Sequence, residues 1–284
     1  MFVTSDRHVV ESGRRDELLV AGVAVTFVDN GNSPAWIQFV EKCARIAGIY
    51  DYLSHAGYDL RDGGKARQVK PKRLIELQND VQYFNTISGL VLRAVVRHPW
   101  KERDIWYGGI IGRSWRNENI INASFTYPLN EHCSSAAFEM LLLASTLLDA
   151  TNGYSYIRDL EYGPETYGIG FPGGDRAMRI TNDSEISEIA GWQEYLAATD
   201  PRIWVMRDLY TENIVSDYVL NLPILGMPLK TAIMNGAIGG EISSNSMSSL
   251  WQIDSRDIPE IRILLGDAGV IWARHGRVYR DLKA

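Results

Sequence analysis

The order of strand-like and helix-like segments constrains the fold of this chain more than any single motif does. Residues 18–28, "LLVAGVAVTFV", are apolar and β-branched, as in a buried strand. Further strand patterns occupy 89–98, 119–128 and 154–171, with helical patterns between them. This mixture predicts an α+β fold with a mainly antiparallel sheet, helices packed on one of its faces, and a smaller α+β C-terminal part.

The helical segments differ in character. Residues 135–150 are apolar on nearly all sides, which predicts a central and nearly fully buried helix. Residues 183–199 form an amphipathic helix pattern, and the last helix is expected to begin at Asp257, with Glu260 completing a capping box.

Two segments lack such regular patterns. Residues 57–73 are rich in glycine and lysine and are expected to form a loop, and residues 201–210, "PRIWVMRDLY", are expected to form a strand. A shift in composition near residues 171–184 predicts a main domain over 1–175 and a C-terminal part over 176–284, packed against it.

The composition and net charge indicate which classes of partner the chain can bind. The chain has 284 residues and a formal net charge of −6, which argues against a nucleic-acid binder and permits a basic protein partner. The two cysteines, Cys43 and Cys133, lack a CxxC neighbour, and the N-terminus is too polar for a signal peptide. No apolar stretch reaches the roughly 18 residues of a membrane span. We expect a cytoplasmic protein with no membrane partner.

Signatures of catalysis are absent from the sequence. There is no GxSxG, no phosphate-binding loop and no dinucleotide-binding glycine motif that follows a strand and opens a helix. The five histidines lack ligand spacing to other His or Cys residues, apart from the adjacent pair His132–Cys133, whose side chains point apart. The sequence therefore predicts no catalytic residue, no bound metal and no cofactor.

The aromatic residues point to binding. The chain has eight Trp and fourteen Tyr, and several lie near turns on half-polar strands. Tyrosine and tryptophan offer large contact areas with one polar tip, which suits recognition of another protein. Residues 150–171 are the richest stretch, and we expect two strands joined at Gly163–Pro164. The predicted partner-binding residues are Tyr154, Tyr156, Arg158, Asp159, Glu161, Tyr162, Tyr167, Trp106 and Tyr107.

Two other functions remain open. Asp159 and Glu161 lie two residues apart on a predicted strand, and together with Arg207 they could form an enzyme site built from scattered groups. The other alternative is a structural subunit of a phage or secretion assembly.

Several short phrases resemble known bacterial proteins. "WIQFVEKCARIAG" (36–48) resembles the early helix of the immunity-protein-52 family and related uncharacterised α+β proteins, and "DIWYGG" (104–109) resembles a tryptophan–glycine phrase of that family. The C-terminal phrases resemble the closing region of other bacterial proteins of unknown function, with Thr211 where a proline is usual.

That family binds and neutralises a cognate toxin, often a nuclease. The resemblance implies an inhibitor without chemistry of its own. The expected function is therefore a non-catalytic, protein-binding immunity or defence-associated protein whose partner is a second protein, such as a basic toxin.

Overall fold

The computed structural model describes residues 19–31, 33–60, 66–79, 87–97, 104–114, 116–159, 183–244 and 248–272. Two sets of strands are present. The main sheet contains β1 (Leu19–Val28), β2 (Leu53–Leu60), β3 (Arg67–Val69), β4 (Ile87–Arg97), β5 (Asp104–Arg113), β6 (Ile120–Pro128), β7 (Asn152–Asp159), β8 (Glu212–Val215), β11 (Glu241–Ser244) and β12 (Ser249–Gln252). A separate hairpin contains β9 (Pro223–Ile224) and β10 (Met227–Pro228).

The main sheet has the strand order β11-β12-β8-β7-β1-β6-β5-β4-β2-β3, and its paired strands are antiparallel. The strands predicted over 18–28, 89–98 and 119–128 are confirmed as β1, β4 and β6. The first part of the segment 154–171 is confirmed as β7, and residues 160–171 lie outside the described part of the chain.

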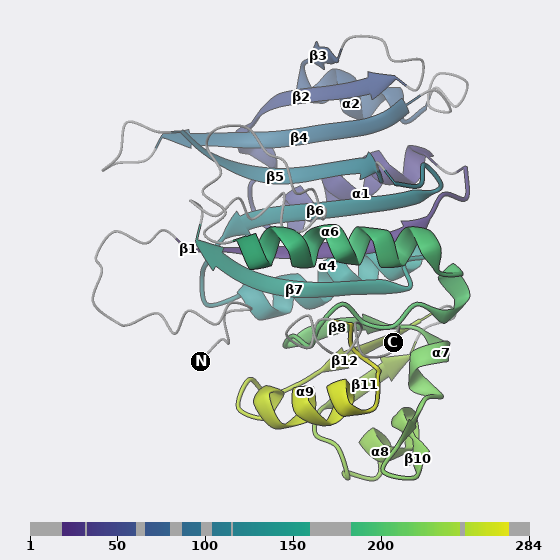
Figure 1. Ribbon diagram of the computed structural model, residues 1–284. Helices are drawn as coiled ribbons and strands as arrows, with labels where there is room; N and C mark the ends of the chain where they lie inside the picture. The colour runs from purple at the N-terminus through teal and green to yellow at the C-terminus, as the bar shows by residue number, and fades with distance from the viewer. Residues whose placement is uncertain are drawn as a thin grey trace.

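The helices and short 3₁₀ turns (η) are α1 (Ser33–Ile46), η1 (Tyr50–Tyr52), α2 (Pro71–Leu77), α4 (Cys133–Leu147), α6 (Asp183–Ala198), η3 (Pro201–Ile203), α7 (Asp217–Leu220), α8 (Leu229–Met234) and α9 (Ile258–Asp267). Figure 1 shows α1 and α4 behind the sheet and α6 in front of it, across β1, β6 and β7. The α+β fold is therefore confirmed. The expectation that helices lie on one face alone is wrong, because α6 covers part of the other face.

The alternation of side chains along β1 separates two layers. Val23, Val25 and Phe27 are buried in the main hydrophobic core, against α1 and α4. Ala24 points the opposite way and packs with Ile189 of α6, because successive side chains of a strand point to opposite faces of a sheet. Both faces of the central strands are thus covered.

The helix α4 is buried on one face only. Met140, Leu141 and Ala144 are fully buried, whereas Leu142 is 39% exposed. The prediction of a nearly fully buried helix is wrong, because α4 packs on α1 and on strands of the sheet from one side and forms the outer layer there. An apolar pattern does not tell how many sides of a helix are covered.

Three local predictions also differ from the structure. The segment 57–73 contains the end of β2, the short strand β3 and the start of α2, where Pro71 lies in the first turn of the helix. Residues 201–210 contain η3 and a single parallel bridge between Met206 and Ile271, and no regular strand. Asp257 precedes α9 without a side-chain cap, because its own backbone is already helical.

The sheet continues across the predicted boundary at residue 175. Strands β8, β12 and β11 extend it at one edge, and α6 packs on strands of the first part. The residues after 183 also build a second core, which contains Leu209, Trp251 and Leu265. None of the helices that the structure describes has the length and apolar character needed to cross a membrane.

Candidate protein-binding face of the sheet

Four of the nine predicted binding residues are buried. Tyr154, Tyr156 and Arg158 lie on β7 and are 5%, 3% and 3% exposed, and Tyr107 on β5 is 7% exposed. The expectation that they offer free surface is not met, because β7 lies between β1 and β8 and its tyrosines face the side covered by α6. Tyr107 points to the core on the opposite face.

The other predicted residues divide into two groups. Trp106 is half-buried at the surface of β5. Asp159 ends β7, and its side chain lies outside the described part, as do Glu161, Tyr162 and Tyr167 entirely.

The tyrosines beneath α6 form an internal layer. The ring of Tyr154 stacks on that of Tyr210, with 4.2 Å between the ring centroids. The hydroxyl of Tyr156 lies 2.8 Å from the Ser124 hydroxyl, and its ring passes over Gly22, where a Cβ atom would lie 2.5 Å from the ring. The Ser124 contact thus satisfies the hydroxyl of Tyr156 inside the protein.

Arg207 belongs to the same layer. It is 1% exposed, donates a hydrogen bond to the Tyr154 hydroxyl, and lies 4.0 Å from the Glu188 carboxylate. Asp208, the next residue, points elsewhere and forms a 2.8 Å ion pair with Arg262 of α9. Burial raises the pKa of Asp208, while Arg262 acts to lower it. The adjacent residues Arg207 and Asp208 therefore contact two different parts of the protein: Arg207 contacts Tyr154 of β7, and Asp208 contacts Arg262 of α9.

Trp106 lies on a part of the sheet that the described helices leave uncovered. We define the open face as the side of β2, β4 and β5 that points away from α1. Its rows follow the strand register: Val95 pairs with Trp106, His55 with Arg93, and Val91 with Ile110. His55 is exposed and the other five are half-buried. No described helix crosses the front of these three strands in Figure 1.

Glycines flatten the open face around Trp106. Gly57, Gly89, Gly108 and Gly112 lie on the same side of the three strands, since they pair with or alternate with the residues of that side. At Gly108 a Cβ atom would lie 2.1 Å from the carbonyl oxygen of Leu92, and its φ is +140°. The strand geometry therefore requires glycine there, and Trp106 stands above a low surface.

Trp106 contacts two polar residues of the neighbouring strands, Arg93 of β4 and His55 of β2. The His55 ring meets it edge-on, with 4.9 Å between ring centroids, and the guanidinium carbon of Arg93 lies 5.6 Å from the centroid of the indole. Trp and Arg dominate the contacts that carry most energy in protein interfaces. The arrangement can bind a partner by burying a pre-positioned indole and an arginine together.

Sequence reasoning found Trp106 and missed its neighbours. His55 and Arg93 come from strands far apart in the chain, and only the sheet register brings them together. A local signal was nevertheless present in β5, where Trp106, Gly108, Ile110 and Gly112 alternate with core residues.

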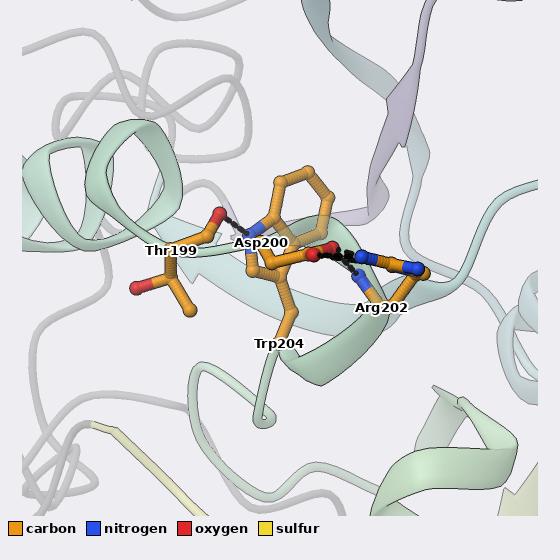
Figure 2. Close-up of polar contacts among 4 residues, drawn as sticks. All are labelled: Thr199, Asp200, Arg202 and Trp204. Atoms are coloured by element: carbon orange, nitrogen blue, oxygen red, sulfur yellow. Dashed lines mark hydrogen bonds and ion pairs between the residues drawn. The ribbon is translucent and has the colours of Figure 1, made fainter.

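The turn after α6 holds that helix in place over the tyrosine layer. Figure 2 shows Asp200, whose carboxylate accepts hydrogen bonds from the backbone N–H and the side chain of Arg202, and Trp204, whose indole N–H donates to the carbonyl of Thr199 at 3.2 Å. Trp204 packs in one cluster with Trp192 of α6 and Trp272. The turn thereby joins the end of α6 to the C-terminal part.

We expect the Asp200–Arg202 pair to lose its contribution to stability in acid. The Arg202 hydrogen bonds lower the pKa of Asp200 from 3.8 to about 2. Because the folded pKa is the lower one, the contribution is present above pH 3.8 and is lost as the pH falls to about 2. An NMR titration of the Asp200 carboxyl measures this directly. A titration midpoint at 3.8 or above would contradict the geometry, and Arg202→Gln should raise the midpoint only part of the way, because the backbone N–H of residue 202 still donates to Asp200.

The described residues contain no group of three His, Cys, Asp or Glu side chains that could hold a metal ion. No protein-family model matches the chain, and no curated protein matches it. Among solved structures, a T6SS protein of Pseudomonas aeruginosa is similar in fold, with a TM-score of 0.52 and 14% sequence identity. The similarity covers 92% of this chain and 76% of that protein. At this identity the likeness concerns the fold alone.

Proposed function

We propose that this chain is a non-catalytic protein-binding protein of bacterial competition or defence, an immunity protein that neutralises a toxin, and that the open face contacts the toxin. The observation that carries the proposal is Trp106, in contact with Arg93 and His55 on a side of the sheet that the described helices leave uncovered. The resemblance to the immunity-protein-52 family supports the finer assignment.

The open face suits binding better than chemistry. Its apolar residues Val91, Val95 and Ile110 lie on the same side of the sheet as the indole, with Val95 directly opposite Trp106, and all three are half-buried. A partner would therefore remove further apolar area from water. Its ionisable groups are poorly placed for proton transfer: His55 and Asp59 are four residues apart on β2, about 13 Å at the rise of a strand. A general base and its orienting group need hydrogen-bond contact.

The similarity in fold supports a role connected with a bacterial secretion system. The similar structure is described as a T6SS protein, and T6SS denotes a bacterial secretion system. A role beside secreted proteins is consistent with that likeness, both for an immunity protein and for a structural subunit of the secretion assembly. The cytoplasmic location expected from the sequence stays a prediction.

The net charge of the chain attracts a basic toxin over long distances and contributes little to the contacts at the open face. A net charge of −6 attracts a basic partner during encounter, and salt screens this attraction beyond about 10 Å. The open face itself carries charged side chains of both signs, Arg93 and Asp59, so its short-range contacts are mainly aromatic and apolar. Added salt should therefore slow association more than it speeds dissociation.

Neutralisation is the decisive property to test. The partner is first isolated from the native host with the tagged chain and identified by mass spectrometry, and the two are then expressed together and separately in a host without the system. We expect the partner alone to stop growth and the chain to restore it. A non-toxic partner would contradict the immunity role and favour a secretion subunit, and turnover of a small molecule by the chain would favour the enzyme alternative.

A further inference from the structure

The hairpin β9–β10 ends in an unusual turn. Ile224 pairs with Met227, so Leu225 and Gly226 form a two-residue turn between the strands. Both have positive φ, +52° at Leu225 and +80° at Gly226. Positive φ at both central positions defines a type I′ turn, whose first position favours Asn, Asp or Gly.

The stability of the folded chain does not explain why residue 225 is a leucine. A branched apolar residue is strained in the left-handed region, and Asn would relieve that strain. The Leu225 side chain is also 58% exposed, so it gains little from the core of its own chain. A strained, exposed leucine at the tip of a hairpin is a feature that a contact with another molecule would account for.

Neighbouring residues extend the apolar tip. Helix α8 packs against both strands of the hairpin, and the side-chain amide of Asn235, just after α8, lies 3.3 Å from the Met227 sulfur. Met234, at the end of α8, is 74% exposed. We call Leu225, Met227, Lys230 and Met234 the apolar prong. Pro223 and Pro228, the outer pair of the hairpin, stiffen its base.

Charge around the prong is sparse and of one sign. Between Asp217 and Glu241 the only charged residue is Lys230, although charged residues make up 23% of the chain. Lys230 is exposed and forms no ion pair with any described residue. The prong thus presents two large apolar side chains and one available cation.

We infer that the apolar prong docks into an apolar pocket of a partner protein that carries a carboxylate at its rim for Lys230. A second copy of this chain fits less well, because a two-fold contact between prongs brings Lys230 toward its own counterpart with no carboxylate nearby. A membrane surface also fits less well, because one lysine supplies little attraction to anionic lipid. The prong lies at the far end of the molecule from β2, β4 and β5 (Figure 1), so this contact is independent of the open face.

Leu225→Asn separates binding from folding. Asn favours the type I′ turn, so the variant should melt about 2 °C higher than wild type while losing the apolar tip. A photo-reactive phenylalanine analogue at position 225, introduced into the full chain in the native host, should cross-link to one partner protein that mass spectrometry identifies. The purified partner should bind Leu225→Asn and Lys230→Glu at least about 10-fold more weakly than wild type.

Ile263→Gln is the matched control. Ile263 on α9 is 57% exposed and lies outside the prong, so its replacement should leave binding unchanged. The inference is overturned if position 225 cross-links to nothing or only to a second copy, if Leu225→Asn binds the partner like wild type, or if anionic vesicles bind wild type and not Leu225→Asn. Trp106→Ala should keep the prong contact intact, which distinguishes a failure here from a failure of the open-face proposal.

Discussion

Replacing Gly108 with alanine is expected to destabilise the protein by about 4 kcal/mol or more, since a strained backbone and a steric clash coincide there. The φ of Gly108 is +140°, which L side chains rarely adopt. The added Cβ atom would lie 2.1 Å from the Leu92 carbonyl oxygen and 2.8 Å from the Arg93 Cα. Both are backbone atoms of the paired strand β4, so no side-chain rotation relieves the clash. Urea denaturation measures the loss in the free energy of unfolding.

Gly112→Ala is the matched control for this prediction. Gly112 lies on the same strand and on the same side of the sheet, yet a Cβ atom there would meet nothing within 4 Å. Its substitution should change stability by about 1 kcal/mol or less, and reduced freedom of the unfolded chain favours a small gain. Equal stability of the two alanine variants would show that the pairing of β4 and β5 differs from the one described.

Replacing Glu212 with alanine is expected to cost about 3 kcal/mol of folding stability. Glu212 is 4% exposed, and its carboxylate accepts hydrogen bonds from the hydroxyls of Ser134, Ser155 and Thr211. These residues belong to the start of α4, to β7 and to the chain just before β8. Alanine would leave the buried hydroxyl of Ser155 and the partly buried hydroxyls of Ser134 and Thr211 without this acceptor, and it would open a cavity where the three elements meet.

Glu212→Gln tests the hydrogen bonds separately from the cavity. Glutamine keeps the volume and one acceptor oxygen, and a serine hydroxyl can rotate to accept from its amide. The loss should be less than half of that for alanine, measured by the same denaturation. If alanine and glutamine destabilise equally, the charge of Glu212 matters and the shared acceptor does not.

Local sequence patterns were enough to predict the helices and strands whose own apolar periodicity is clear. The β-branched run 18–28 and the strand pattern in 119–128 predicted β1 and β6, and the helix predicted over 183–199 is present as α6. In these segments the spacing of apolar residues is that of a helix or strand with its apolar side chains on a buried side.

Burial of the predicted site could not be read from the same patterns. In β7, Tyr154 and Tyr156 lie on one side of the strand and Ser155 on the other, as the alternation of a strand requires. That alternation does not say which side another element will cover. That depends on α6, which begins 24 residues after β7 ends. The exposed Leu142 of α4 reflects the same limit, since the number of neighbours around a helix is a property of the tertiary fold.

The open face illustrates a second limit. His55, Arg93 and Trp106 approach each other because β2, β4 and β5 pair in one register, and a slip by one residue would turn the side chains of a strand to the other face. The segment carrying the end of β2 was expected to be a loop. Without knowledge of the strand register, the sequence does not identify the residues that contact Trp106.

The affinity of the isolated partner for Trp106→Ala, measured by isothermal titration calorimetry beside wild type and Leu142→Ala, tests the binding role of the open face most directly. Leu142 is also partly exposed but lies on α4, behind the sheet. The account predicts that Trp106→Ala binds at least about 10-fold more weakly, while Leu142→Ala stays within about twofold of wild type. Circular dichroism should show both variants folded. Wild-type affinity of a folded Trp106→Ala variant would contradict the account.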